Sequence, residues 1–181
     1  EENSWGERFF EKYKEKKEIS SQPFLKWLKT DKNDFLTWEQ VRNSVCLFSE
    51  RLSRSLSRGD RCVLLSENRP EWLIADIAIM NAGGITVPLF TTYSEKDYEY
   101  IINDCKPKVC IISNDIQFKK IEKFISSETK VISIENFNQK IESIETILKK
   151  YPKKDKINIS ENYNDKILRK DLACIIYTSG T

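Results

Sequence analysis

The sequence predicts an α/β fold built on a doubly wound, mostly parallel sheet with flanking helices. Five short apolar runs lie between residues 61 and 177, and stretches with helical periodicity separate them. Apolar runs without polar alternation are typical of strands that are buried on both faces of a parallel sheet. At 181 residues the chain is also long enough for one sizeable core of ~100–200 residues.

The first third of the chain is expected to precede this sheet. Aromatic and charged residues alternate between Trp5 and Lys17, as in an amphipathic helix. Two apolar runs at 24–28 and 35–38 flank a polar turn, which predicts a β-hairpin. Thr37 is the predicted N-cap of a long helix, because apolar residues recur after it at intervals of three and four until the chain reaches Arg58 and Gly59.

Strands and helices are expected to alternate from residue 61. The predicted strands are 62–65, 85–90, 109–112, 131–134 and 172–177, and the helices between them start near Pro70, Ser94, Asn114 and Ile141. Asn68 is the expected cap of the helix that contains Glu71, with Pro70 in its first turn. Pro88 lacks an N–H group, so its strand should be irregular or lie at a sheet edge.

Composition narrows the class of protein. The 30 basic and 28 acidic residues leave a net charge of +2, which gives no reason to expect a nucleic-acid partner. With no histidine in the sequence, no imidazole can act as a base or a metal ligand. The five cysteines include no C-x-x-C pair, and four sit in apolar stretches, as expected for buried, reduced thiols of a cytosolic protein.

No targeting or membrane-spanning segment is predicted. The N-terminal residues lack the apolar stretch of a signal peptide, and polar residues, glycines and a proline interrupt the apolar region 73–90. The expected location is therefore the cytoplasm, with peripheral contact with a membrane left open.

Small polar residues follow the last predicted strand. Thr178, Ser179, Gly180 and Thr181 supply hydroxyl groups, free backbone N–H groups and one glycine, a combination that can wrap a phosphate. The alternative is an ordinary Ser/Gly turn, since such turns end many strands. The loop is not a Walker A motif, because that spacing and its lysine are absent.

Three blocks resemble the adenylate-forming (AMP-binding) enzyme superfamily. The residues Tyr177–Thr181, YTSGT, resemble the opening of its phosphate loop, YTSGTTG-x-PKG. The block Asn68–Asp76, continued by Ala82–Leu89, resembles the N-terminal region of long-chain acyl-CoA synthetases. Phe35–Glu39 is similar to that family's entry into its first long helix. The blocks occur in the family's order and span most of the chain.

This resemblance implies that residues 1–181 are the N-terminal part of an AMP-binding domain. Its expected parts are 1–60 before the sheet, 61–177 as the βαβ sheet and 178–181 as the start of the phosphate loop, with the C-terminal remainder absent. The chain alone is therefore expected to be inactive.

The resemblance also implies a two-step ligase reaction. A fatty acid attacks ATP to give an acyl-adenylate and pyrophosphate, and coenzyme A then displaces AMP. The implied cofactors are ATP, Mg²⁺ and coenzyme A. Thr178, Ser179, Gly180 and Thr181 would bind the ATP phosphates, whereas no catalytic residue and no metal ligand is expected in these residues.

Other functions remain open at this point. The protein could be an adenylate-forming ligase for a different carboxylic acid. It could also be a non-catalytic α/β interaction or regulatory module in which the TSGT ending is incidental. A nucleic-acid-binding module is disfavoured by the balanced charge.

Overall fold

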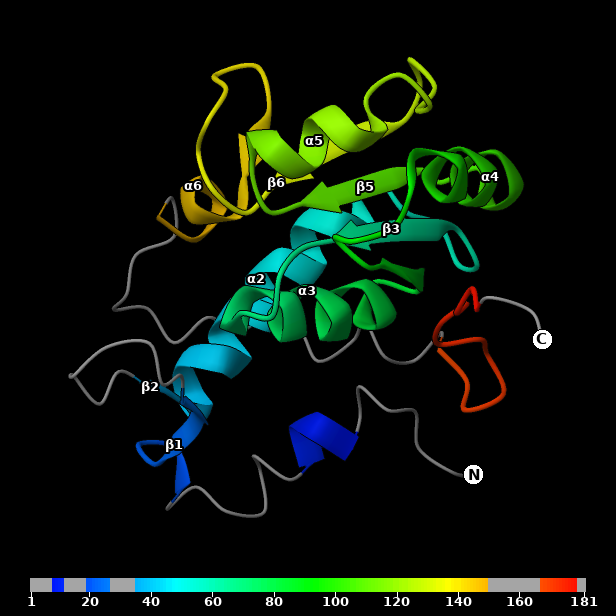
Figure 1. Ribbon diagram of the computed structural model, residues 1–181. Coiled ribbons are helices and arrows are strands. Elements are labelled where there is room, and N and C mark those ends of the chain that lie inside the picture. The colour runs from blue at the N-terminus through cyan, green and yellow to red at the C-terminus, as the bar shows by residue number, and fades with distance from the viewer. Residues whose placement is uncertain (1–7, 12–18, 27–34, 150–166, 179–181) are drawn as a thin grey trace.

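A parallel five-stranded sheet forms the middle layer of the molecule (Figure 1). The computed structural model describes residues 8–11, 19–26, 35–149 and 167–178. The sheet has the order β4-β3-β5-β6-β7, and every neighbouring pair is parallel. Its strands are β3 (Arg61–Leu65), β4 (Ile85–Leu89), β5 (Val109–Ile112), β6 (Lys130–Ser133) and β7 (Glu142–Ser143).

Helices cover both faces of this sheet, so the predicted α/β fold is confirmed (Figure 1). One face packs against α2 (Trp38–Ser53), α3 (Pro70–Asn81) and α6 (Ile144–Lys149). The other face packs against α4 (Glu95–Cys105) and α5 (Asp115–Ile121). Strand β4 follows β3 in the chain and lies beside it at one edge of the sheet. The chain then crosses to β5, which lies beside β3 in the opposite direction along the sheet, so the sheet is doubly wound.

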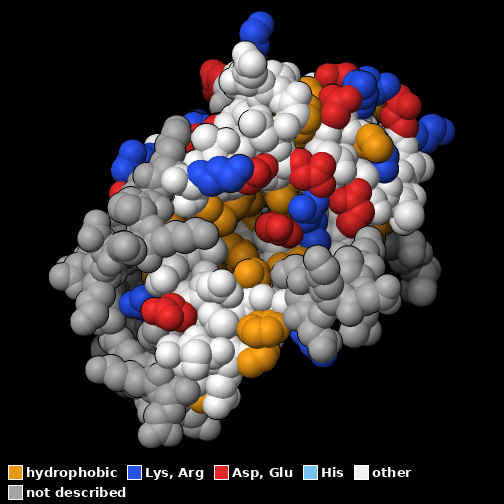
Figure 2. Space-filling view, turned by 90° about the vertical axis from the view of Figure 1, so that its left-hand side faces the viewer, with side chains coloured by type: hydrophobic (Ala, Val, Ile, Leu, Met, Phe, Trp, Pro, Cys, Tyr) orange, Lys and Arg blue, Asp and Glu red, His pale blue; other side chains and the backbone are white. Residues whose placement is uncertain are grey.

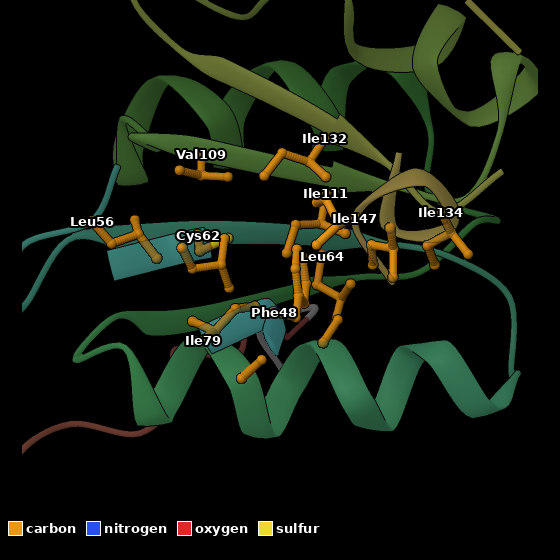
Figure 3. Close-up of a cluster of buried hydrophobic side chains, with 14 residues drawn as sticks. Phe48, Leu56, Cys62, Leu64, Ile79, Val109, Ile111, Ile132, Ile134 and Ile147 are labelled. Carbon is orange, nitrogen blue, oxygen red and sulfur yellow. The ribbon is translucent and has the colours of Figure 1, made fainter. Parts of the chain in front are cut away.

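Alternation of side chains along the strands creates a separate core on each face. Cys62 and Leu64 of β3 pack with Phe48 of α2 and Ile79 of α3 (Figure 3). Their neighbour Val63 instead packs with Tyr98 of α4 on the opposite face. Strands buried on both faces need apolar residues at every position, which explains why these runs lack polar alternation.

A third apolar cluster joins the N-terminal elements to the helices. Strands β1 (Pro23–Lys26) and β2 (Phe35–Thr37) pair antiparallel, so the predicted hairpin is confirmed in its two strands. The Phe24 and Trp38 rings lie 4.0 Å apart, and Phe9 from the helical residues 8–11 is buried beside them. The rest of the predicted helix 5–17 and the hairpin turn lie outside the described residues.

Three predicted helix caps occur as hydrogen-bonded caps. Thr37 forms a capping box with Gln40, and Ser94 forms one with Asp97. The Asn114 side chain accepts from the Gln117 amide. Each cap satisfies backbone donors that have no partner within their helix.

The prediction of Asn68 as a cap is wrong. The N-cap of α3 is Arg69, which has an extended backbone and whose side chain forms no capping hydrogen bond. Pro70 occupies the first turn, as expected. Proline at this position has no N–H to satisfy, so α3 can begin without a polar cap.

Helix α2 also ends earlier than the sequence pattern predicts, at Ser53. The amide of Ser57 is bound by the Asp60 carboxylate at 2.8 Å, and Gly59 then turns the chain with φ +86°. Leu56 is still buried in the core, so the apolar spacing continues past the end of the helix.

The segment 172–177 corrects a further prediction, because it is not a strand buried on both faces. It forms one parallel bridge, between Cys174 and Thr86 of the edge strand β4. Leu172 and Ile176 are 65% and 63% exposed. The segment therefore lies along the outer side of β4 and is not in the middle of the sheet.

Pro88 explains why this pairing is so short. The Thr86 amide donates to the Ala173 carbonyl, and the Thr86 carbonyl accepts from the Ile175 amide. In a parallel ladder the next donor would come from residue 88 of β4. Proline has no N–H, so the ladder stops there, and the prediction that Pro88 marks an irregular or edge strand is confirmed.

Within the described residues, none of the helices combines the length and the apolar character needed to cross a membrane.

Candidate functional site

The carboxyl ends of the parallel strands point to one side of the molecule. The arrowheads of β3 and β5 lie on the left in Figure 1, and Figure 2 views the molecule from that side. Hydrophobic side chains are visible in the middle of this face, with acidic and basic side chains around them (Figure 2). Ligands of open α/β sheets bind at this edge, close to the point where the strand order reverses.

That reversal occurs between β3 and β5. The loop after β3 leads to α3 on one face, whereas the loop after β5 leads to α5 on the other. Glu67 follows β3, and its carboxylate accepts a hydrogen bond of 2.7 Å from the Gln117 amide of α5. This side-chain contact ties the loop after β3 to the first turn of α5.

Arg69 makes a second connection across this edge. Its guanidinium lies 2.8 Å from the Glu71 carboxylate in α3 and 2.6 Å from the Glu135 carboxylate that follows β6. Arg69 is part of the Asn68–Asp76 motif block, whereas Glu135 is an isolated charge 66 positions away that no motif or pattern indicates. Ion pairs with both neighbours neutralise this arginine, so the network holds loops in place.

The Glu67 carboxyl group favours its ionised form in this setting. Burial alone would raise its pKa, but hydrogen bonding, including the bond from Gln117, and the nearby Arg69 charge together lower it. The carboxylate is therefore charged at neutral pH.

The segment that leads to the predicted phosphate loop ends beside the β4–α4 loop. The Tyr93 hydroxyl of that loop donates to the Tyr177 carbonyl at 3.0 Å. The Tyr177 hydroxyl donates to the Asp104 carboxylate of α4 at 2.5 Å. Burial is the largest cause that raises the pKa of the Tyr177 phenol, and the hydrogen bond to Asp104 is the second. The phenol therefore remains protonated and can donate.

The predicted site residues begin directly after Tyr177. Thr178 is exposed and has no side-chain hydrogen bond within the described part of the chain. Ser179, Gly180 and Thr181 lie outside the described residues. Sequence reasoning missed Tyr93 and Asp104, since the contact between Tyr177 and Asp104 spans 73 positions and neither residue belongs to a motif block.

Two further features of the described residues lie apart from this loop. The described residues contain no group of three or more His, Cys, Asp or Glu side chains able to hold a metal ion, so we assign no Mg²⁺ ligand. A cavity of about 700 Å³ lies at the opposite end of β4, lined by residues that include Met80, Gly83, Ile85 and the Arg58–Asp171 ion pair. It is not adjacent to the end of the segment at Tyr177.

Comparison with models of protein families identifies the family of this chain. The model for AMP-binding enzymes matches residues 8–181, nearly the whole chain. The chain belongs to the AMP-binding enzyme family. The matched region includes the edge segment and the TSGT residues that follow it.

Relatives within the AMP-binding family include acyl-CoA synthetases. The mitochondrial acyl-coenzyme A synthetase ACSM3 of Homo sapiens is 26% identical over 169 residues, which are 89% of this chain and 27% of that protein. The long-chain-fatty-acid–CoA ligase ACSBG2 of Gallus gallus is 29% identical over 135 residues, 70% of this chain and 17% of that protein. The chain thus spans only 17–27% of the length of these two relatives.

Solved structures share the fold at lower identity. A red-emitting luciferase from Phrixothrix hirtus aligns with a TM-score of 0.79 and 18% identity over 99% of this chain and 34% of the luciferase. The anthranilate CoA ligase AuaEII, in complex with anthranoyl-AMP, aligns with a TM-score of 0.65 and 21% identity over 83% of this chain and 28% of the ligase. The described fold is therefore that of the N-terminal region of adenylate-forming enzymes.

Proposed function

We propose that the protein containing this chain activates a fatty acid with ATP and transfers the acyl group to coenzyme A. The observation that carries the proposal is the sequence YTSGT at the end of an anchored segment, beside the loop that follows β4. The family assignment supports ATP-dependent adenylate formation. The similarity to a long-chain-fatty-acid–CoA ligase supports the choice of a fatty acid as substrate.

In this proposal, Thr178 to Thr181 bind the polyphosphate of ATP. The hydroxyls of Thr178, Ser179 and Thr181 donate to phosphate oxygens, and Gly180 lets the backbone approach them. Negative charge accumulates on the pyrophosphate as it leaves the α-phosphate. Fixed donors stabilise that charge most strongly where water is excluded.

Coenzyme A takes part in the second step and Mg²⁺ in the handling of the polyphosphate, as the family resemblance implies. The described residues provide no ligand set for the metal, so no step is assigned to it here. Their proposed contribution is the positioning of the phosphate loop.

The test is carboxylate-dependent exchange of labelled pyrophosphate into ATP, measured on the product of the complete gene that contains this chain. A panel of hexadecanoate, octanoate, anthranilate and an amino acid distinguishes the substrate classes. We expect exchange with the fatty acids and formation of the acyl-CoA thioester when coenzyme A is added.

The 181-residue chain alone, run in parallel, should show no exchange and no thioester, because it spans only 17–27% of the length of the two acyl-CoA-forming relatives. Exchange that depends on anthranilate or an amino acid, and not on fatty acids, would favour a ligase for another carboxylic acid. A complete gene product without exchange on any acid would contradict the proposal and favour a non-catalytic module.

A further inference from the structure

The backbone alone holds the end of segment 172–177 weakly. Its two ladder hydrogen bonds both involve Thr86, and Pro88 cannot supply the next one. Ile176 is 63% exposed and therefore adds little packing. Ile175 and Tyr177 are partly buried and pack against the apolar cluster on the α4 face. Apolar packing is not directional, so the position from which the phosphate loop starts also needs a specific contact.

Two side chains supply that contact at Tyr177. Tyr93 binds its backbone carbonyl at 3.0 Å, and Asp104 binds its hydroxyl at 2.5 Å. One bond fixes the main chain and the other fixes the orientation of the side chain. Together they restrain Tyr177 at both ends, immediately before Thr178.

Helix α4 provides a rigid base for both contacts. Its first turn is closed by the capping box between Ser94 and Asp97. Tyr98 is 2% exposed, and its hydroxyl donates at 2.8 Å to the carbonyl of Phe90, directly after β4. The loop that carries Tyr93 and the helix that carries Asp104 are thus joined to each other and to the sheet.

We propose that Tyr93 and Asp104 are positioning residues for the phosphate loop and act through Tyr177. The inference rests on the proposed ligase function, and it assigns a role in that function to residues outside the YTSGT motif. Their effect is indirect. They hold the backbone from which the donors of Thr178 to Thr181 extend, so that these donors need not be reorganised as charge develops on the leaving pyrophosphate.

Substitution of each contact should lower the rate of adenylation more than it weakens substrate binding. For Tyr93→Phe we expect a fall of about 2- to 12-fold in kcat of pyrophosphate exchange, the range of a neutral hydrogen bond. For Asp104→Ala we expect about 10- to 150-fold, because the lost acceptor is charged. The KM for ATP should change by less than kcat, since the loop remains present but is less well placed.

Conservative and double variants separate positioning from fold damage. Asp104→Asn retains an acceptor for the Tyr177 hydroxyl and should recover most of the activity lost in Asp104→Ala. The effects of Asp104→Ala and Tyr177→Phe should be less than additive in the double variant, because both remove one bond. Glu99→Gln, which neutralises an exposed carboxylate elsewhere on α4, is the matched control and should keep wild-type kcat.

Amide hydrogen exchange on the same complete gene product tests the contacts independently of activity. Peptides covering residues 175–178 should exchange faster in Tyr93→Phe and Asp104→Ala than in wild type, with unchanged exchange in β3 and β5. If the wild type is active and both variants keep its kcat and its pattern of amide hydrogen exchange, the positioning role is wrong while the ligase function stands. If the wild type is inactive, the ligase function fails. Unchanged amide hydrogen exchange at residues 175–178 in both variants would then overturn the contacts as well.

Discussion

Individual cysteines differ in their surroundings in a way that their sequence contexts do not predict, since Cys174 lies in an apolar stretch and is exposed, whereas Cys105 has polar neighbours and is buried. Cys46, Cys62, Cys105 and Cys110 are buried, whereas Cys174 is exposed because segment 172–177 lies outside the edge strand. Burial raises the pKa of Cys62 well above its usual value and that of Cys105 to about 11. The thiolate is the reactive form, so the buried thiols are doubly protected.

For the 181-residue chain, we predict that one thiol reacts rapidly with a chromogenic disulfide reagent at pH 8 and that all five react in guanidinium chloride. Cys174→Ser should remove the fast reaction, because this side chain is the exposed one. Two or more fast thiols in the native chain, or a fast thiol that survives Cys174→Ser, would contradict the described burial.

At the level of single elements, local chemistry predicted the start of most helices. Caps at Thr37, Ser94 and Asn114 could be read from the sequence because each involves residues only three positions apart. The position of segment 172–177 could not. Its composition resembles that of a central strand, but its pairing depends on which strand lies beside it. The sequence indicates that the strand with Pro88 is irregular or at an edge, but it does not indicate that residues 172–177 pair with that strand.

The cap of α2 gives the clearest test at this level. Thr37→Ala removes the side-chain oxygen that accepts from the Gln40 amide at 3.2 Å and leaves the backbone N–H that donates to the Gln40 side chain at 2.8 Å. It should lower the free energy of unfolding by about 1 kcal/mol, with a range of roughly 0.5–2. The control is Ser44→Ala in the middle of the same helix, where alanine has the better helix propensity and stability should hold or rise.

Denaturant unfolding of both variants provides the measurement. A loss in Ser44→Ala as large as that in Thr37→Ala would show that the effect does not come from the cap.

At the level of the whole molecule, the sheet brings together groups that are distant in the sequence. Glu67, Gln117, Arg69 and Glu135 join the loop after β3 to helix α5 and to the loop after β6. Tyr93 and Asp104 hold the segment that ends at Tyr177. The YTSGT motif could be found from the sequence because it is continuous. The residues that support it could not, since their contacts span 50–84 positions.

The phosphate loop is the central claim, and its hydroxyl groups test it most directly. The measurement is pyrophosphate exchange on the complete gene product with Thr178, Ser179 or Thr181 replaced singly by alanine. A hydrogen bond to a charged group contributes about 1.5–3 kcal/mol, so loss of one that acts in the transition state predicts a fall of roughly 10- to 150-fold in rate. Melting temperatures should stay at the wild-type value. Three variants with wild-type exchange rates and wild-type melting temperatures would contradict the assignment of this loop to the ATP phosphates.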